Sequence, residues 1–88
     1  MFVLHFSSQA QANIKDFKEA GNKAMLKKLN ILLNELTEHP TNGTGKPEQL
    51  KYELSNCWSR RISKEHRLVY EIVADEVFIL SVKGHYRK

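Results

Sequence analysis

The sequence predicts a small α+β domain in which an N-terminal strand and a two-helix hairpin pack on one face of an antiparallel β-sheet. Three observations favour this fold class. The 88 residues are enough for one domain with a small core. Two stretches with helical apolar periodicity come early in the chain, and strand-like runs separated by turn residues follow them. We therefore expect a single domain that covers 1–88.

The first forty residues are expected to form the strand and the hairpin. Residues 1–6 are apolar and prone to β-structure, so they are predicted as the first strand. The helical hairpin is predicted over 7–39. The pair Ser7-Ser8 offers the cap of its first helix, Gly21 is the break between the helices, and Asn22 is the cap of the second helix. The second helix carries one apolar stripe that should face the core, consisting of Met25, Leu26, Leu29, Leu32, Leu33 and Leu36.

The second half is expected to be a loop followed by a meander of strands. Residues 40–48 are predicted as the loop, with Gly43, Gly45 and Pro47 as breakers. The segment 49–86 is predicted as the antiparallel meander that carries the candidate site. Its expected strands cover 49–54, 58–63, 66–73 and 77–83.

Composition narrows the class of protein. Cys57 is the single cysteine, which excludes a disulfide framework and favours a reducing cytoplasm. Beside Trp58 it is interpreted as a packing residue rather than a nucleophile. No stretch approaches the length of a membrane span, and no cluster of acids and histidines has the spacing of metal ligands. We expect a cytoplasmic protein without membrane association, metal or cofactor.

The charges are unevenly distributed. The net charge is +4, and all four arginines lie in the second half of the chain. Arginine suits bidentate contacts with phosphate, so this half is the expected contact surface for an anionic partner, although basic surfaces often only solvate a protein.

Strand alternation indicates where the polar side chains of the meander point. One parity holds most of the apolar residues and, in the last strand, includes Phe78, Leu80 and Val82. The opposite parity holds Lys51, Arg61, Arg67 and His85, together with apolar residues such as Val69 and Val77. We therefore expect a concave basic surface on the helix-free face. Arg60 has the parity of Trp58 and Ile62, so its stem is expected to pack or its head to reach an edge.

These groups could cut RNA through its own 2′-hydroxyl. Glu48 would act as general base and His85 as general acid. Arg61 and Arg67, with Lys51, would stabilise the charge on phosphorus. Two interpretations without catalysis remain open. Glu48 would be a solvated loop carboxylate paired with Lys46 or Lys51, and His85 would be an exposed terminal residue.

Two further residues near the candidate site have expected roles. Tyr86 would stack on a base or pack against the sheet edge, and His66 is interpreted as structural.

Several segments match a known pattern, namely GTGKPEQLK at 43–51, LS at 54–55, WSRRI at 58–62, EHRLVY at 65–70 and HY at 85–86. This pattern resembles the Txe/YoeB family of bacterial toxins in the RelE/ParE superfamily, which form one half of type II toxin–antitoxin pairs. The resemblance covers about half of the chain. The first forty residues agree with the family in layout more than in detail.

The resemblance implies an mRNA interferase that enters the ribosomal A site and cleaves the message without a metal. The implied catalytic residues are Glu48 as base, Arg67 at the phosphate and His85 as acid. The implied phosphate contacts are made by Lys51 and Arg61, and Tyr86 would stack on a base. Lys46 and Arg60 are further expected contacts with phosphate or RNA. The product would be a 2′,3′-cyclic phosphate, or its opened form, and a free 5′-hydroxyl. The implied partners are a cognate antitoxin protein, mRNA and the bacterial ribosome, and a homodimer is left open.

Two other classes of protein are alternatives, one with the same scaffold and one with the same basic face. A ParE-like protein would inhibit DNA gyrase without being an enzyme, but it has no use for a complete set of acid and base. A passive RNA-binding module would keep the basic face and would not depend on Glu48 or His85. The chain departs from many relatives in that Arg87 and Lys88 follow the His-Tyr pair.

Overall fold

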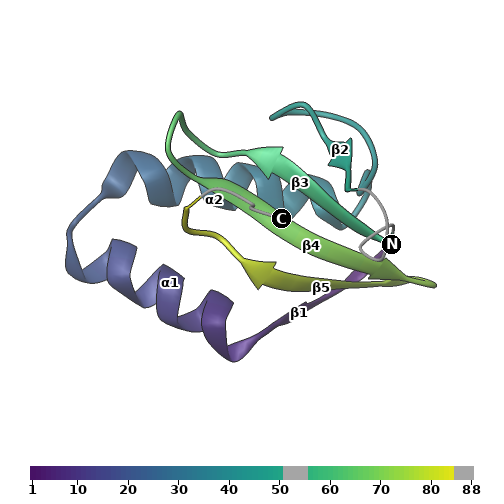
Figure 1. Ribbon diagram of the computed structural model, residues 1–88, viewed down its shortest axis with the longest axis horizontal. Helices are drawn as coiled ribbons and strands as arrows, with labels where there is room; N and C mark the ends of the chain where they lie inside the picture. The colour runs from purple at the N-terminus through teal and green to yellow at the C-terminus, as the bar shows by residue number, and fades with distance from the viewer. Residues whose placement is uncertain (51–55, 85–88) are drawn as a thin grey trace.

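The computed structural model of the chain describes residues 1–50 and 56–84. Two helices pack against one face of a five-stranded sheet, as Figure 1 shows, and the expected α+β class is confirmed. The elements are, in chain order, β1 (Val3–Phe6), α1 (Ser8–Glu19), α2 (Lys23–Leu36), β2 (Glu48–Gln49), β3 (Cys57–Arg61), β4 (Arg67–Val73) and β5 (Glu76–Ser81).

The sheet has the strand order β1-β5-β4-β3-β2. The strands β2 to β5 pair antiparallel, as expected of a meander. The first strand instead pairs parallel with β5, and Val3 lies opposite Glu76. A parallel pairing is accessible because both helices intervene between β1 and the meander. The sheet is therefore mixed, with β1 and β2 at its edges and β5, β4 and β3 in its interior.

Both predicted helix starts are confirmed. The Ser7 hydroxyl accepts a hydrogen bond from the Ala10 amide, and the Asn22 side chain accepts one from the Met25 amide. Gly21 follows α1 with a φ of 68°, a conformation that costs glycine little. At 12 and 14 residues, the two helices of the described ranges are too short and too polar to cross a membrane.

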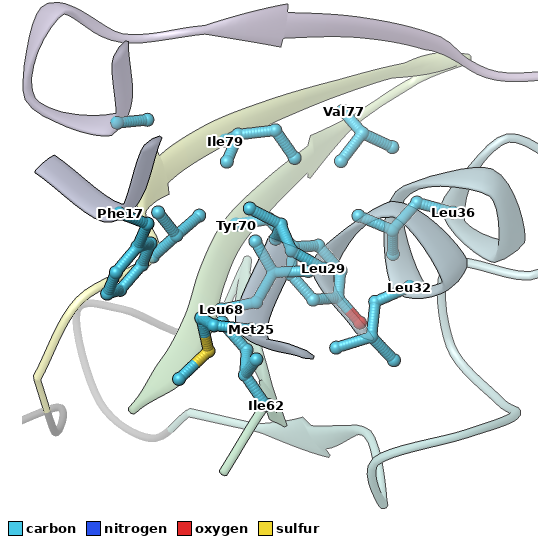
Figure 2. Packing of buried hydrophobic residues seen from close by; sticks show 12 residues of the cluster. Phe17, Met25, Leu29, Leu32, Leu36, Ile62, Leu68, Tyr70, Val77 and Ile79 are labelled. Atoms are coloured by element: carbon cyan, nitrogen blue, oxygen red, sulfur yellow. The ribbon is translucent and has the colours of Figure 1, made fainter. Parts of the chain in front are cut away.

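The core lies between the helices and the sheet. The predicted stripe on α2 supplies much of it. Figure 2 shows its buried members, Met25, Leu29, Leu32 and Leu36, beside residues of β4 and β5. Tyr70 stands at the centre of this layer and is fully buried. We call this side of the sheet the covered face and the helix-free side the open face. The buried members of the core are Ala10, Phe17, Met25, Leu29, Leu32, Leu36, Ile62, Leu68, Tyr70, Val77, Ile79 and Val82.

The predicted orientation of the last strand is wrong at four positions, from Val77 to Leu80. Val77 and Ile79 are fully buried in the core on the covered face, so alternation places Phe78 on the open face, where its ring stacks on His5. Leu80 packs with a smaller open-face cluster that consists of Leu50, Cys57 and Val69.

The physical reason is an irregularity in the ladder between β4 and β5. Tyr70 pairs with Ile79 and Val69 pairs with Ser81, so Leu80 is an extra residue on β5. Strand parity changes at this point. Val82 therefore returns to the core, as the sequence predicted.

Candidate active site

The candidate site lies on the open face, where β2, β3 and β4 run side by side (Figure 1). Glu48 pairs with Ser59, and Arg61 pairs with Arg67. Residues directly opposite each other on paired strands project to the same face. The structure thus brings three of the predicted site residues, Glu48, Arg61 and Arg67, onto one small area of the sheet.

Arg67 is the best-fixed of these side chains. Its Nε donates to the Ser59 hydroxyl oxygen at 3.2 Å, and Ser59 itself is buried. The Arg67 side chain is only 18% exposed, so the guanidinium is held against the sheet while part of it faces outward. Ser59 was not singled out from the sequence, although it shares the predicted parity of Arg61.

Glu48 lies beside Arg67 and remains open to solvent. Its Oε1 is 3.9 Å from Nη2 of Arg67, and its side chain is 72% exposed. This separation is an ion pair but is too long for a hydrogen bond. Within the described part of the chain, the carboxylate therefore stays near a fixed positive charge with its oxygens open to solvent, where they can accept a proton from a hydroxyl.

Arg61 and Arg67 place two like charges directly opposite each other, an arrangement that destabilises a sheet. Arg61 is exposed, and within residues 1–50 and 56–84 its side chain has no hydrogen-bond or ion-pair partner. A bound anion would lie between or beside both guanidinium groups and offset their repulsion. This part of the open face is therefore suited to a phosphate.

The loop before β2 is tied to the strand that bears Arg61. The Arg61 amide donates to the Gly45 carbonyl at 2.8 Å. A Cβ on Gly45 would lie 2.7 Å from the Arg61 carbonyl oxygen, and its φ of 84° also requires glycine. Lys46 follows in an exposed left-handed conformation, with a φ of 51°. The predicted contact residue Lys46 is thus two positions from Glu48, at the rim of the site.

The C-terminal end of the described chain approaches the same site. The Arg67 amide donates to the Gly84 carbonyl at 2.9 Å, and the Gly84 amide donates to Nδ1 of His66 at 2.8 Å. The His66 ring also meets Phe17 edge-on, which agrees with the structural interpretation of His66. Gly84 is thereby held on both sides next to the start of β4.

Three predicted site residues lie outside the described residues, namely Lys51, His85 and Tyr86. Their roles stay predictions. His85 directly follows Gly84 in the sequence.

The structure corrects the expected RNA contact of Arg60. Its side chain is 0% exposed and lies on the covered face, where Nη1 is 2.9 Å from Oε1 of Glu35 and Nε donates to the Tyr70 hydroxyl. Strand alternation turns it away from Arg61, and burial removes it from any phosphate on the open face. Arg60 is a structural cation here, not a phosphate ligand.

Cys57 is buried beneath the open face. Burial raises the pKa of its thiol, and the nearby charge of Glu71 adds to the effect. A thiol held in its neutral form is a poor nucleophile, which fits the packing role expected from the sequence.

The chain matches a protein family along most of its length. Residues 6–86 fit the family model of the YoeB-like toxin of bacterial type II toxin–antitoxin systems. The toxin YoeB of Synechocystis sp. is 44% identical over 70 residues, which are 80% of this chain and 81% of that protein. The toxin YoeB of Escherichia coli K12 is 46% identical over 65 residues, which are 74% of this chain and 77% of that protein.

Solved structures agree with the sequence relatives. The YoeB dimer from Staphylococcus aureus superposes with a TM-score of 0.85 at 42% identity, over 97% of this chain and 98% of that chain. The YoeB–YefM complex from the same organism gives a TM-score of 0.83 at 42% identity, over 98% and 99%. A YoeB/ParE toxin from Agrobacterium tumefaciens gives a TM-score of 0.88 at 29% identity, over 97% and 100%.

Proposed function

Because this chain belongs to the YoeB-like toxin family of bacterial type II toxin–antitoxin systems, we propose that it is an endoribonuclease that cleaves mRNA in the ribosomal A site. The observation that carries the proposal is the open-face group of Glu48, Arg67 and Arg61. A solvent-accessible carboxylate next to two guanidinium groups can deprotonate a hydroxyl and stabilise a phosphate at the same place.

The reaction begins at a ribose 2′-hydroxyl. Glu48 takes its proton, and the resulting oxygen attacks the adjacent phosphorus. Negative charge grows on the phosphoryl oxygens in the pentacoordinate state, and Arg67 and Arg61 stabilise it. The bond to the 5′-oxygen breaks as that oxygen receives a proton from His85. The products are a 2′,3′-cyclic phosphate and a free 5′-hydroxyl, and the scheme needs no metal ion.

Gly84 supports the assignment of His85. The backbone bond to Arg67 brings the chain beside the phosphate-binding arginine one residue before His85. An imidazole can both donate and recover a proton at neutral pH, as a leaving-group acid requires. Lys51 would add positive charge at the phosphate, Tyr86 would stack on a base, and Lys46 at the rim would contact the RNA backbone.

The proposed partners are mRNA, the ribosome and a cognate antitoxin in the bacterial cytoplasm. The relative from Staphylococcus aureus is described as a complex with YefM and as a dimer. A corresponding antitoxin for this chain would cover or disturb the open face. A dimer of this chain is proposed on the same ground.

The test is primer extension on a defined mRNA translated in a purified bacterial system. Wild-type protein should produce new 5′ ends within the A-site codon, and none without ribosomes. Glu48→Gln and Arg67→Ala should each slow cleavage about 10²–10⁴-fold, the usual contribution of a general base or a charge-stabilising donor. Glu38→Gln is a matched control, because Glu38 is exposed just beyond α2, and it should cleave like the wild type.

Two results would count against the proposal. An intact message at doses that arrest growth would overturn it and favour the gyrase-inhibiting alternative. Cleavage that is unaffected by Glu48→Gln would remove Glu48 as the base.

A further inference from the structure

We propose that Arg60 is a positioning residue for the active site, which holds the loop before β2 so that Lys46 and Glu48 reach the open face. This inference rests on the proposed function, because it assigns a second layer to the same site. Arg60 itself would touch no RNA, since it is buried on the covered face.

Every nitrogen of the Arg60 guanidinium has a partner. Nε donates to the Tyr70 hydroxyl at 3.2 Å. Nη1 donates to Oε1 of Glu35 at 2.9 Å and approaches the Thr44 carbonyl oxygen at 3.4 Å. Nη2 donates to the Asn42 carbonyl at 2.7 Å and to the His39 carbonyl. Three of these five acceptors are backbone carbonyls of a single loop.

The same loop has two further anchors in this layer. The Tyr70 hydroxyl donates to the Pro40 carbonyl at 2.5 Å, and the Thr44 amide donates to Oε1 of Glu35 at 2.8 Å. Gly43 passes close to that carboxylate, since a Cβ there would lie 2.4 Å from it. The loop between α2 and Lys46 is therefore shaped around one buried cation.

The anchored loop leads directly to the catalytic carboxylate. Past Thr44, the Gly45 carbonyl accepts from the Arg61 amide, and Glu48 then pairs with Ser59. On β3, Ser59 and Arg61 project to the open face and Arg60 lies between them on the covered face. The loop and β2 are thus bonded to three successive residues of β3. They bond to Ser59 and Arg61 through the backbone and to Arg60 through its side chain on the covered face.

This arrangement affects catalysis beyond its effect on stability. Glu48 is largely exposed, and among the residues that the structure describes its side chain has only a long ion pair to Arg67, so its position depends on the backbone that carries it. Lysine in place of Arg60 would keep the charge but lacks the planar, five-donor fork that reaches several carbonyls at once. A displacement of about 1 Å in a catalytic group can cost about 100-fold in rate.

The experiment compares wild type, Arg60→Lys and Met25→Ala in the purified translation system. Met25 is buried at the opposite end of α2 from the loop, so its truncation lowers stability without touching the loop. At a temperature where all three proteins are folded, we expect Arg60→Lys to lower kcat about 10–100-fold and to leave KM for programmed ribosomes within about twofold. Met25→Ala should keep kcat.

A second readout needs no cleavage. Amide hydrogen exchange by NMR on the free protein should be accelerated in Arg60→Lys at Thr44 and Arg61, whose amides hold the loop, more than at the core amide of Leu32. Met25→Ala should not single out Thr44 and Arg61 in this way. If wild type cleaves no message, the proposed function fails, while the exchange data still test the position of the loop.

The proposal is overturned if exchange at Thr44 and Arg61 is unchanged in Arg60→Lys, or if kcat falls only as far as in Met25→Ala. If Arg60→Lys does not fold, the experiment uses Tyr70→Phe instead. The Tyr70→Phe variant keeps the ring but removes the hydroxyl that anchors the Pro40 carbonyl and accepts from Arg60. The same exchange pattern and the same loss of kcat are then required of Tyr70→Phe.

Discussion

Arg60 and Arg61 are neighbours on β3 and have opposite environments. Arg60 is fully buried, and the protein supplies acceptors for all three of its guanidinium nitrogens. Arg61 is exposed, and its side chain has no such acceptor among the residues that the structure describes. A buried guanidinium is tolerated only when it is paired and hydrogen-bonded, whereas an exposed one stays available to a ligand.

The two faces of the sheet differ in the same way. On the covered face, polar groups satisfy one another and fix a single arrangement. On the open face, Arg61 stands opposite Arg67, and Glu48 meets Arg67 only at 3.9 Å. The open face thus keeps an unfavourable charge pair that an anionic ligand would relieve. Stability resides on the first face and the capacity for binding on the second.

The largest expected effect comes from truncating the two arginines in turn. Arg60→Ala should lower the free energy of unfolding by about 3–5 kcal/mol, because it leaves buried acceptors and the Glu35 carboxylate without their partner. Arg61→Ala should change it by no more than about 0.5 kcal/mol, as is usual for an exposed side chain. Urea denaturation of both variants measures the difference.

RNA binding should show the reverse order, with a larger effect for Arg61→Ala than for Arg60→Ala. A single-stranded RNA that lacks the attacking 2′-hydroxyl can be bound without being cut. For Arg61→Ala, the slope of log affinity against log salt should fall by about 0.7, the value for one lost phosphate contact on a single strand. Equal losses of stability in the two variants, or an unchanged slope, would contradict the division between the faces.

Tyr70→Phe should have the next largest effect. It leaves the Pro40 carbonyl without its donor and Nε of Arg60 without its acceptor, which should cost about 1–3 kcal/mol of unfolding free energy. The open-face counterpart is Ser59→Ala, which removes one hydrogen bond to the partly exposed Arg67 and should cost about 1 kcal/mol. Thermal unfolding compares the two, and a larger loss in Ser59→Ala would contradict the comparison.

The smallest expected effect is a dependence on pH. A hydrogen bond from the Thr44 side chain, followed by the Thr44 amide and Arg60, lowers the pKa of Glu35 below its usual value of 4.5. A lowered pKa stabilises the folded state above pH 4.5, and this stabilisation is lost as the pH falls through the pKa of the folded protein. Glu35→Gln should therefore flatten the acid limb of stability against pH. An unchanged acid limb would show that this carboxylate is not coupled to folding.

The local signals in the sequence were reliable where one interaction decides the structure. Ser7 and Asn22 cap helices because their side chains reach an amide three residues later, which spacing alone reveals. The orientation of Arg61 and Arg67 followed from alternation on regular strands. Alternation failed at Leu80, because one extra residue in β5 reverses parity and leaves no mark in the hydrophobic pattern.

The role of Arg60 could be predicted only in part. Its parity with Trp58 and Ile62 already pointed to the covered face. Its acceptors are carbonyls of residues 39–44, however, and the fold of an irregular loop is not encoded in residue spacing. The assignment of Arg60 to RNA contact therefore failed because the number of carbonyls that surround it becomes visible only in three dimensions.

The parallel pairing of β1 with β5 has a consequence for synthesis of the chain. Val3 is made well before its partner Glu76, which follows only after both helices and three other strands. Contacts so distant in sequence form slowly and late. The nascent chain cannot close its sheet until β5 has been translated, nor bring Gly84 to Arg67 until Gly84 has been added. The proposed active site is therefore completed only late in the synthesis of the segment from Val3 to Gly84.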